Sequence, residues 1–329
     1  MLVWLRRTAI TIAVLLVITL AAFFLSPWPS VLVLRTLGDD GLGGAEANEK
    51  LVPDGISSQL DVQIGYGDDD RIDVFRPEAA DHPLPAVVWV HGGGFIGGVK
   101  EPLRPYLKIL ASHGYVTVNV EYSKAPENRY PKAVEQVDHA LGYVVDHADE
   151  LGLDPKRIVL GGDSAGAHIA AQTAIATTDR EYAEHAGLPQ SISSSKLRGM
   201  ILFSGPFDLD MVGSGSFLER WYIRTVMWSY TGERGFADDA STQWLSLVDH
   251  VSSQTPPAFI STGPNDPLLA HSESMIAALK KAAVDTDALL FDAKTTPDSV
   301  GHEYQLALAT PQAQEALDRV VAFLAEVTS

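Results

Sequence analysis

The pentapeptide Gly-Asp-Ser-Ala-Gly at 162–166 lies between an apolar, β-like run at 157–161 and an alanine-rich helical stretch at 167–174. The glycines that flank Ser164 have no Cβ, so the chain can turn sharply from a strand into a helix and leave the serine Oγ exposed on a strained backbone. A chain with this feature must place a buried strand, a tight turn and a helix in succession. Ser164 is therefore the first candidate nucleophile; the alternative is a turn serine that caps a helix.

Apolar runs and helical patterns alternate along the chain after residue 58. Strands are predicted at 59–65, 71–76, 86–91, 115–122, 157–162, 199–204, 258–263 and 288–292, and helices at about 102–113, 131–150, 165–177, 271–283 and 311–327. The central runs are nearly continuous in Val, Ile and Leu, as expected of strands that are covered on both faces. The order predicts an α/β fold with a mostly parallel eight-stranded sheet flanked by helices and an antiparallel hairpin at its start.

One segment, at about 207–247, interrupts this alternation with a concentration of large apolar side chains. They are Trp221, Tyr222, Met227, Trp228, Tyr230, Phe236 and Trp244. Ligands of such sheets gather at the carboxyl ends of the strands, and an insertion above that edge can form a cap that lines an acyl pocket. The segment is therefore predicted to be a cap insertion, with packing into a small core of its own as the alternative.

The amino-terminal segment contains an uncharged apolar run at 8–25, directly after Arg6 and Arg7. Its length is close to the ~20 residues of a bilayer-spanning helix, and the arginines favour a cytoplasmic amino terminus. Residues 1–30 are therefore predicted to be a membrane anchor with the rest of the chain extracytoplasmic. Secretion after cleavage of a signal peptide is the alternative, although 23–30 lacks a small-x-small cleavage site. Residues 31–58 are expected to be a linker or part of a lid, and residues 59–329 one catalytic domain.

Composition excludes several classes of function. The net charge is −18 although residues 1–36 hold three arginines and no acid, so the body of the protein is strongly acidic. Such a body repels phosphate backbones, which argues against nucleic-acid binding. The chain contains no cysteine, which removes thiol nucleophiles, disulfides and cysteine-ligated metals. No histidine and carboxylate cluster has metal-ligand spacing, so a metal enzyme is not predicted.

The motif His-Gly-Gly-Gly-Phe at 91–95 directly follows the apolar run 87–90. Consecutive glycines let backbone N–H groups approach a substrate oxygen without obstruction by side chains, which is what an oxyanion hole requires. Gly92, Gly93 and Ala165, the residue after the serine, are the predicted donors. Phosphate binding is the alternative use of such a loop, but no Gly-Lys-Ser/Thr continuation follows. The histidine of the motif is expected to fix the loop through hydrogen bonds.

A serine nucleophile needs a base to take its proton and a carboxylate to orient that base. In sheets of this kind the acid and then the histidine follow the serine along the chain, each in a loop after a later strand. Asp266 lies in the turn just after the predicted strand 258–263, and His302 lies in the polar loop after the strand 288–292. They are the predicted acid and base.

Other histidines fit the base less well. His271 follows Asp266 too closely and begins a helix, while His168 lies one helical turn beyond the serine, where a packing or hydrogen-bonding role is expected. His250 and Asp249 precede a strand rather than follow it, which places them at the wrong end of the sheet. Among the acids, Asp292 and Asp298 remain open as alternatives to Asp266. Asp163, inside the turn at 162–166, is expected to be a local hydrogen-bonding residue.

Together the motifs at 91–95, 162–166, 263–268 and 301–302 resemble those of the hormone-sensitive-lipase-like esterases of the α/β-hydrolase fold, over about residues 60–327. The segment 71–77 also looks like an early strand of that family. The resemblance implies hydrolysis of small-molecule carboxylic esters, of short to medium acyl chain, by a serine–histidine–aspartate triad through an acyl-enzyme. It implies that the triad is Ser164, Asp266 and His302, that Gly92, Gly93 and Ala165 hold the oxyanion, and that no cofactor is used.

Two positions depart from the pattern of many of these esterases. After the turn at 162–166 the chain continues with Ala167 and His168, where many of these esterases have Gly-Asn. The Ala-His pair is similar to the related kynurenine-formamidase and isoprenylcysteine-methylesterase branches. Glu303 follows His302, where a small or aromatic residue is often found. An aryl-formamidase or amidase with the same triad is therefore one alternative function. The other is a non-catalytic, membrane-tethered binding module, although such modules usually lose the serine or the histidine.

Overall fold

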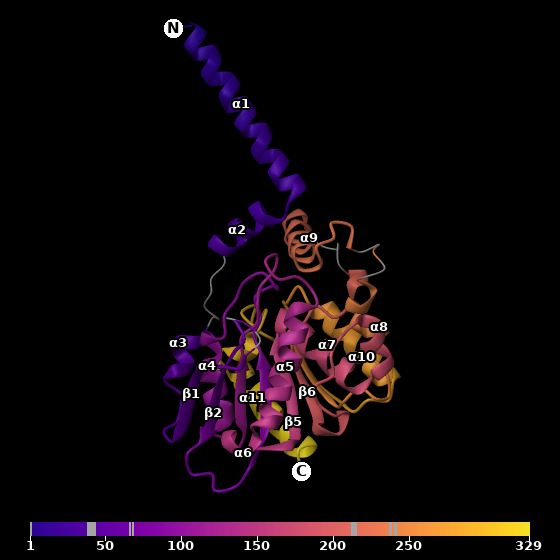
Figure 1. Ribbon diagram of the computed structural model, residues 1–329. Helices are drawn as coiled ribbons and strands as arrows, with labels where there is room; N and C mark the ends of the chain where they lie inside the picture. Colours follow the sequence, from indigo (N-terminus) through magenta and orange to yellow (C-terminus); the bar gives the residue numbers. More distant parts are fainter. Residues whose placement is uncertain are drawn as a thin grey trace.

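A central sheet of eight strands organises the protein (Figure 1). The computed structural model describes residues 2–37, 44–65, 67, 69–211, 216–236, 239 and 242–329. The strands are β1 (Ile56–Gln63), β2 (Arg71–Pro77), β3 (Leu84–Val90), β4 (Val116–Val120), β5 (Leu153–Asp163), β6 (Leu197–Phe203), β7 (Ala258–Thr262) and β8 (Thr286–Leu290). Their order across the sheet is β1-β2-β4-β3-β5-β6-β7-β8. The pairs β1–β2 and β2–β4 are antiparallel and the other pairs are parallel, so the predicted α/β fold with an initial hairpin is confirmed.

Helices cover both faces of this sheet because its strands are apolar on both sides. In β3, Val88 and Val90 belong to the core formed with α5 (Lys132–Asp146), α7 (Ala165–Thr178) and α10 (Leu269–Lys281). Val87 and Trp89 face the opposite core, which is formed with α4 (Arg104–Ala111) and α11 (Pro311–Val327). The alternation follows from the period of two in a strand. It explains the continuous apolar runs of the sequence.

Two short helices were not expected from the sequence. The helical stretch predicted at 131–150 is divided at His147 into α5 and α6 (Ala148–Leu151). A separate helix, α8 (Arg180–Ala186), follows α7, and the Asp179 side chain caps it by accepting a hydrogen bond from the Tyr182 N–H at 3.0 Å. Such a cap satisfies one of the free amides at a helix start.

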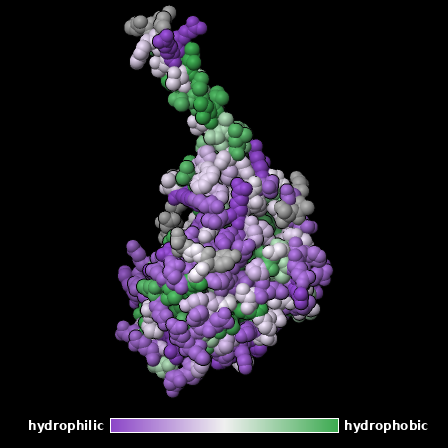
Figure 2. Space-filling model, in the orientation of Figure 1, coloured by the Kyte–Doolittle hydropathy of each residue, from purple (hydrophilic) through white to green (hydrophobic). Residues whose placement is uncertain are grey.

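The amino-terminal helix α1 (Leu2–Leu25) projects away from the body (Figure 1), and its apolar surface is exposed (Figure 2). Among the described residues, its stretch Trp4–Leu25 is the one helix that is long and apolar enough to cross a membrane. Length and composition of this kind fit either a membrane anchor or a signal sequence.

The segment 31–58, expected to be a linker or part of a lid, contributes α3 (Ala45–Glu49) and most of α2 (Trp28–Leu37). Arg35 on α2 donates hydrogen bonds to the carbonyls of Ile96 and Ala125 and pairs with Glu127 at 2.7 Å. Asn48 on α3 is buried and exchanges hydrogen bonds with the backbone at residues 306 and 308. Both helices therefore contact the body of the protein, whereas residues 38–43 lie outside the described part.

The segment predicted as a cap, 207–247, contains the helix α9 (Phe217–Thr231). Ser216 and Glu219 form a capping box at its start, and Gly232 ends it with a left-handed φ of 84°. Within the segment, residues 212–215, 237, 238, 240 and 241 lie outside the described part. Tyr230 stacks on Phe95 with ring centroids 4.1 Å apart, so α9 packs against the glycine-rich loop that follows β3.

Candidate active site

The turn between β5 and α7 holds Ser164 in a rare backbone conformation, with φ 50° and ψ −120°. The backbones that meet here are so close that a side chain would not fit: a Cβ on Gly166 would lie 2.1 Å from the Val90 carbonyl oxygen, and one on Gly162 would lie 2.5 Å from Gly166. The two glycines are thus required by close backbone approach. The strained serine at the end of a central strand is the geometry that the elbow motif predicts.

The three residues predicted as a triad lie in one hydrogen-bonded line. Ser164 Oγ is 3.0 Å from His302 Nε2, and His302 Nδ1 is 3.0 and 3.1 Å from the two carboxylate oxygens of Asp266. The Asp266 side chain is buried after the end of β7, and it also accepts a hydrogen bond from the Leu268 N–H at 2.8 Å. Because β5, β7 and β8 are parallel, the loops after their carboxyl ends meet at one edge of the sheet.

The charges around His302 control its titration. Burial lowers the pKa of the imidazole, but the hydrogen bond to Asp266 and the nearby carboxyl groups of Glu303, Asp266 and Asp163 outweigh it and raise the pKa to about 9. Nδ1 faces Asp266, so the carboxylate holds the imidazole proton on that nitrogen by accepting its hydrogen bond. Nε2 is the nitrogen that faces Ser164. This tautomer lets Nε2 accept the serine proton.

A second acidic pair lies beside the triad, and sequence reasoning missed it. Asp163 is fully buried and accepts hydrogen bonds from Trp89 Nε1 and from the Gly92 amide, both at 2.7 Å. The carboxyl group of Glu303 is also hydrogen-bonded to Asp163. Burial and the Asp163 charge raise the pKa of Glu303 to about 8, and burial raises the pKa of Asp163. Two carboxyl groups in contact cannot both ionise easily, so near neutral pH they share one proton.

The glycine-rich loop differs from the prediction at Gly92. Its N–H is directed at the Asp163 carboxylate, so the expectation that Gly92 donates to an oxyanion is corrected. The next two residues, Gly93 and Gly94, have left-handed φ values of 119° and 59°. Within the part of the chain that the structure describes, their amides and that of Ala165 donate to no protein acceptor.

The histidine of the loop motif has the structural role expected for it. The ring of His91 is buried, stacks on Tyr122 with centroids 4.3 Å apart and donates from Nδ1 to the Gly92 carbonyl at 2.6 Å. Burial lowers its pKa to about 3, and its Nε2 lies 3.2 Å from the Glu121 carboxylate. His91 therefore supports the loop.

The other candidate histidines and acids lie outside the triad. His168 is buried and donates from Nε2 to the Leu245 carbonyl at 3.0 Å, and His271 Nδ1 accepts from the Asp208 N–H at 3.2 Å. His250 donates to the Gln243 carbonyl at 3.1 Å. Asp292 caps its own turn by accepting from the Lys294 N–H at 2.9 Å. Among the described residues, no group of three or more His, Cys, Asp and Glu side chains is placed to hold a metal ion.

The helix α9 of the cap reaches the glycine-rich loop through Tyr222. A Cβ added to Gly94 would lie 2.5 Å from the Tyr222 hydroxyl oxygen and 3.7 Å from the Val226 side chain. The phenol therefore lies beside the backbone of Gly94. One of the aromatic residues predicted to line a cap thus contacts the loop that faces the serine.

Comparison with known proteins places the chain in a family. The BD-FAE family model matches residues 72–281. A protein named a probable isoprenylcysteine alpha-carbonyl methylesterase of Arabidopsis thaliana is 30% identical over 244 residues, which cover 71% of this chain and 50% of that protein. An acetyl esterase of Salmonella schwarzengrund is 29% identical over 221 residues, covering 63% of this chain and 62% of that enzyme. The chain thus spans half to about three fifths of the length of these curated relatives.

Among solved structures, a hyperthermophilic esterase of the archaeon Pyrobaculum calidifontis is similar with a TM-score of 0.68 and 26% sequence identity. The similarity covers 91% of this chain and 94% of that one. The fold, the ordered motifs and the matching family model lead to one assignment. The chain belongs to the BD-FAE family, among the hormone-sensitive-lipase-like esterases of the α/β-hydrolase fold.

Proposed function

We propose that this protein is a serine carboxylesterase that hydrolyses short- to medium-chain carboxylic esters through an acyl-enzyme. The observation that carries the proposal is the line of contacts from Ser164 Oγ to His302 Nε2 and from His302 Nδ1 to Asp266. The name of one relative, acetyl esterase, describes esters of a short acyl chain, which supports the short end of this range.

The reaction proceeds in two halves in this proposal. His302 Nε2 takes the proton of Ser164 as Oγ attacks the ester carbonyl, and the Asp266 carboxylate stabilises the imidazolium that forms. The imidazolium returns the proton to the departing alcohol, which leaves the acyl group on the serine. A water molecule then gives its proton to His302 and attacks the acyl-enzyme, and the acid is released as Ser164 is reprotonated. The kinetics are therefore ping-pong.

The oxyanion is held by backbone amides of the glycine-rich loop and the elbow. Gly93, Gly94 and Ala165 are the proposed donors, because their N–H groups have no protein acceptor in the described part of the chain. Ala165 is also the first residue of α7, and the free amides at a helix start favour negative charge. Gly92 keeps a supporting role through its hydrogen bond to Asp163.

The test is hydrolysis of p-nitrophenyl esters from acetate to palmitate by the full-length protein in detergent. We expect turnover to be highest on the short to medium chains and to vanish in Ser164→Ala, while the exposed Ser193→Ala control keeps it. Turnover that persists in Ser164→Ala would contradict the proposal. Activity on N-formyl aryl amides in place of the esters would identify a formamidase, and inactivity on both would identify a binding module.

We also propose that α1 anchors the protein in a membrane, with the catalytic domain on the extracytoplasmic side. Support comes from the exposed apolar surface of Trp4–Leu25 and from Arg6 and Arg7 near its amino end. Intact mass and carbonate extraction test this proposal. A mature protein that lacks residues 1–25 and is released by carbonate would be a secreted one.

A further inference from the structure

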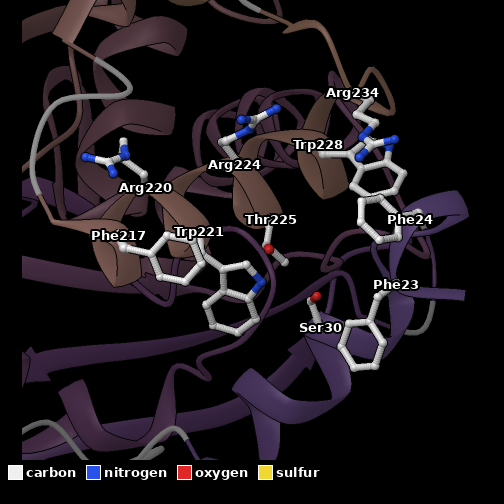
Figure 3. A pocket seen from close by; sticks show the side chains of 10 residues that line it. All are labelled: Phe23, Phe24, Ser30, Phe217, Arg220, Trp221, Arg224, Thr225, Trp228 and Arg234. Atoms are coloured by element: carbon white, nitrogen blue, oxygen red, sulfur yellow. The ribbon is translucent and has the colours of Figure 1, made fainter. Parts of the chain in front are cut away.

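A groove lies where α1 and α2 meet the cap helix α9 (Figure 3). Its volume is about 430 Å³. Phe23, Phe24 and Ser30 line one side, and α9 with the residue Arg234 beyond it lines the other. The residues of α9 in the groove are Phe217, Arg220, Trp221, Arg224, Thr225 and Trp228. The lining therefore combines aromatic rings with three arginines, and neither the proposed reaction nor the packing of the core uses this combination.

The helix α9 presents two faces with different partners. Residues at 217, 221, 224 and 228 follow a helical spacing of three and four, so they share the face that lines the groove. Residues at 222, 226 and 230 share the opposite face, where Tyr222 and Val226 approach Gly94 and Tyr230 stacks on Phe95. The groove and the candidate active site thus lie on opposite sides of one helix.

The charge of the groove is opposite to that of the protein. Arg220, Arg224 and Arg234 are exposed in a chain whose net charge is −18. Glu219 offsets part of this charge, because Arg220 acts on its carboxylate. Arg224 forms no ion pair or hydrogen bond with any described residue. An exposed arginine of this kind is available to an anion from outside the chain.

Aromatic rings surround the third arginine. The Arg234 guanidinium lies 5.5 Å from the ring centroid of Phe24 on α1 and 5.5 Å from that of Trp228 on α9. Trp and Arg side chains are favoured at the level of lipid headgroups, since the rings contact acyl chains and the charge contacts phosphate. The groove lies at the body end of the apolar helix, and Figure 2 shows the change from apolar to hydrophilic surface at this junction.

We propose that this groove binds an anionic phospholipid of the membrane, with the headgroup phosphate at the arginines and the upper acyl chain on the aromatic rings. The proposal rests on the proposed membrane anchoring by α1, because that anchor puts the groove at the bilayer surface. It does not depend on ester hydrolysis. A lipid in the groove contacts α1 and α9 together, so it holds the cap helix against the membrane while the other face of the helix contacts the loop at Gly94.

The test is native mass spectrometry of the full-length protein in detergent, titrated with phosphatidylglycerol or with phosphatidylcholine of the same acyl chains. The variants are Arg224→Gln, which breaks no ion pair or hydrogen bond of the described residues, and the double variant Arg224→Gln with Arg234→Gln. Exposed arginines away from the groove supply the matched control, Arg180→Gln with Arg198→Gln. All proteins carry Ser164→Ala, which removes the proposed nucleophile, so that the lipid is not hydrolysed during the titration.

We expect one phosphatidylglycerol to bind at least tenfold more tightly than phosphatidylcholine. Each groove arginine that is removed should weaken the binding of phosphatidylglycerol about fivefold, as a basic residue near an anionic lipid surface does. The control should keep the preference. Equal binding of the two lipids, an unchanged preference in the double variant, or displacement of the lipid by millimolar inorganic phosphate would overturn the proposal. The intact mass in the same spectra reports separately whether α1 is retained, and turnover of the parent with Ser164 reports the proposed reaction.

Discussion

Glu303 is hydrogen-bonded through its carboxyl group to Asp163, although the two residues are 140 positions apart in the chain. Glu303 follows the candidate base and Asp163 precedes the candidate nucleophile. Asp163 also accepts the amide hydrogen of Gly92, so this acidic pair joins the elbow, the glycine-rich loop and the histidine loop. A proton shared by the pair is then part of the structure that positions the triad.

The pair should shift the pH dependence of turnover. Because Glu303 raises the pKa of His302, replacement by the neutral Gln should lower that pKa and make the imidazole an available base at lower pH. We expect kcat/KM of the wild type to rise with pH towards about 9 and the rising limb of Glu303→Gln to move to lower pH. Steady-state rates on one ester from pH 5 to 10 measure this. Superimposable profiles would show that the Glu303 charge does not act on the base.

The same substitution should change how stability depends on pH. The pKa of Glu303 is about 8 in the folded protein against 4.5 for an ordinary Glu, so between these values the folded state holds a proton that the unfolded state has lost. The wild type therefore loses stability as pH rises through this window, by at most about 1.4 kcal/mol per pH unit for one proton. Glu303→Gln lacks this loss. From pH 5 to pH 8, the melting temperature of the wild type should fall relative to that of Glu303→Gln. A difference between the two melting temperatures that does not change with pH would contradict the raised pKa of Glu303.

Asp266→Asn should lower kcat by about 10⁴-fold with little change in fold, because an amide cannot hold the imidazole in the same tautomer or stabilise its positive charge. The matched control is Asp298→Asn, which replaces an exposed acid of the neighbouring loop that was an alternative candidate. Stopped-flow or steady-state rates with circular dichroism of each variant give the comparison. If Asp298→Asn were the impaired variant, the assignment of the acid would be wrong.

Gly94→Ala should impair the stabilisation of the oxyanion. The φ of 59° is unfavourable for alanine, and the added Cβ would lie 2.5 Å from the Tyr222 hydroxyl, so the loop or the cap helix has to move. Loss of one amide donor costs about 10²–10³ in kcat. The control is Gly235→Ala, where the added Cβ meets no atom within 4 Å. Near-native kcat in Gly94→Ala would remove Gly94 from the proposed donors.

The sequence predicts those parts of the protein that depend on local pattern. All eight strands are found where they were predicted, with ends that differ by a few residues. The central strands are buried on both faces, which requires continuous apolar runs, whereas the edge strand β1 is mostly exposed. The positions of Ser164, Asp266 and His302 also follow from local pattern, since a loop after a parallel strand has a fixed place at the sheet edge.

Three features depend on contacts between distant segments and could not be predicted in this way. The direction of the Gly92 amide is set by the carboxylate of Asp163, 71 residues later, and the glycine motif contains no sign of that partner. The helices of the 31–58 segment are held by the polar contacts of Arg35 and Asn48 and by the buried Val31, in a stretch with little periodicity. The contact between Glu303 and Asp163 is the third feature, because the sequence marks Glu303 only as an acid where small or aromatic residues are common and does not show its partner.

The Arg35 guanidinium connects the amino-terminal helices to the backbone carbonyl of Ile96, two residues after the last glycine of the motif. Arg35 therefore holds α2 against the body of the protein, so the segment after α1 is not a free linker. A truncated protein that begins before Trp28 keeps this attachment, whereas one that begins after Leu37 loses it. Two water-soluble forms cut at these points would share the same triad residues and differ in the rigidity of the loop that faces the substrate.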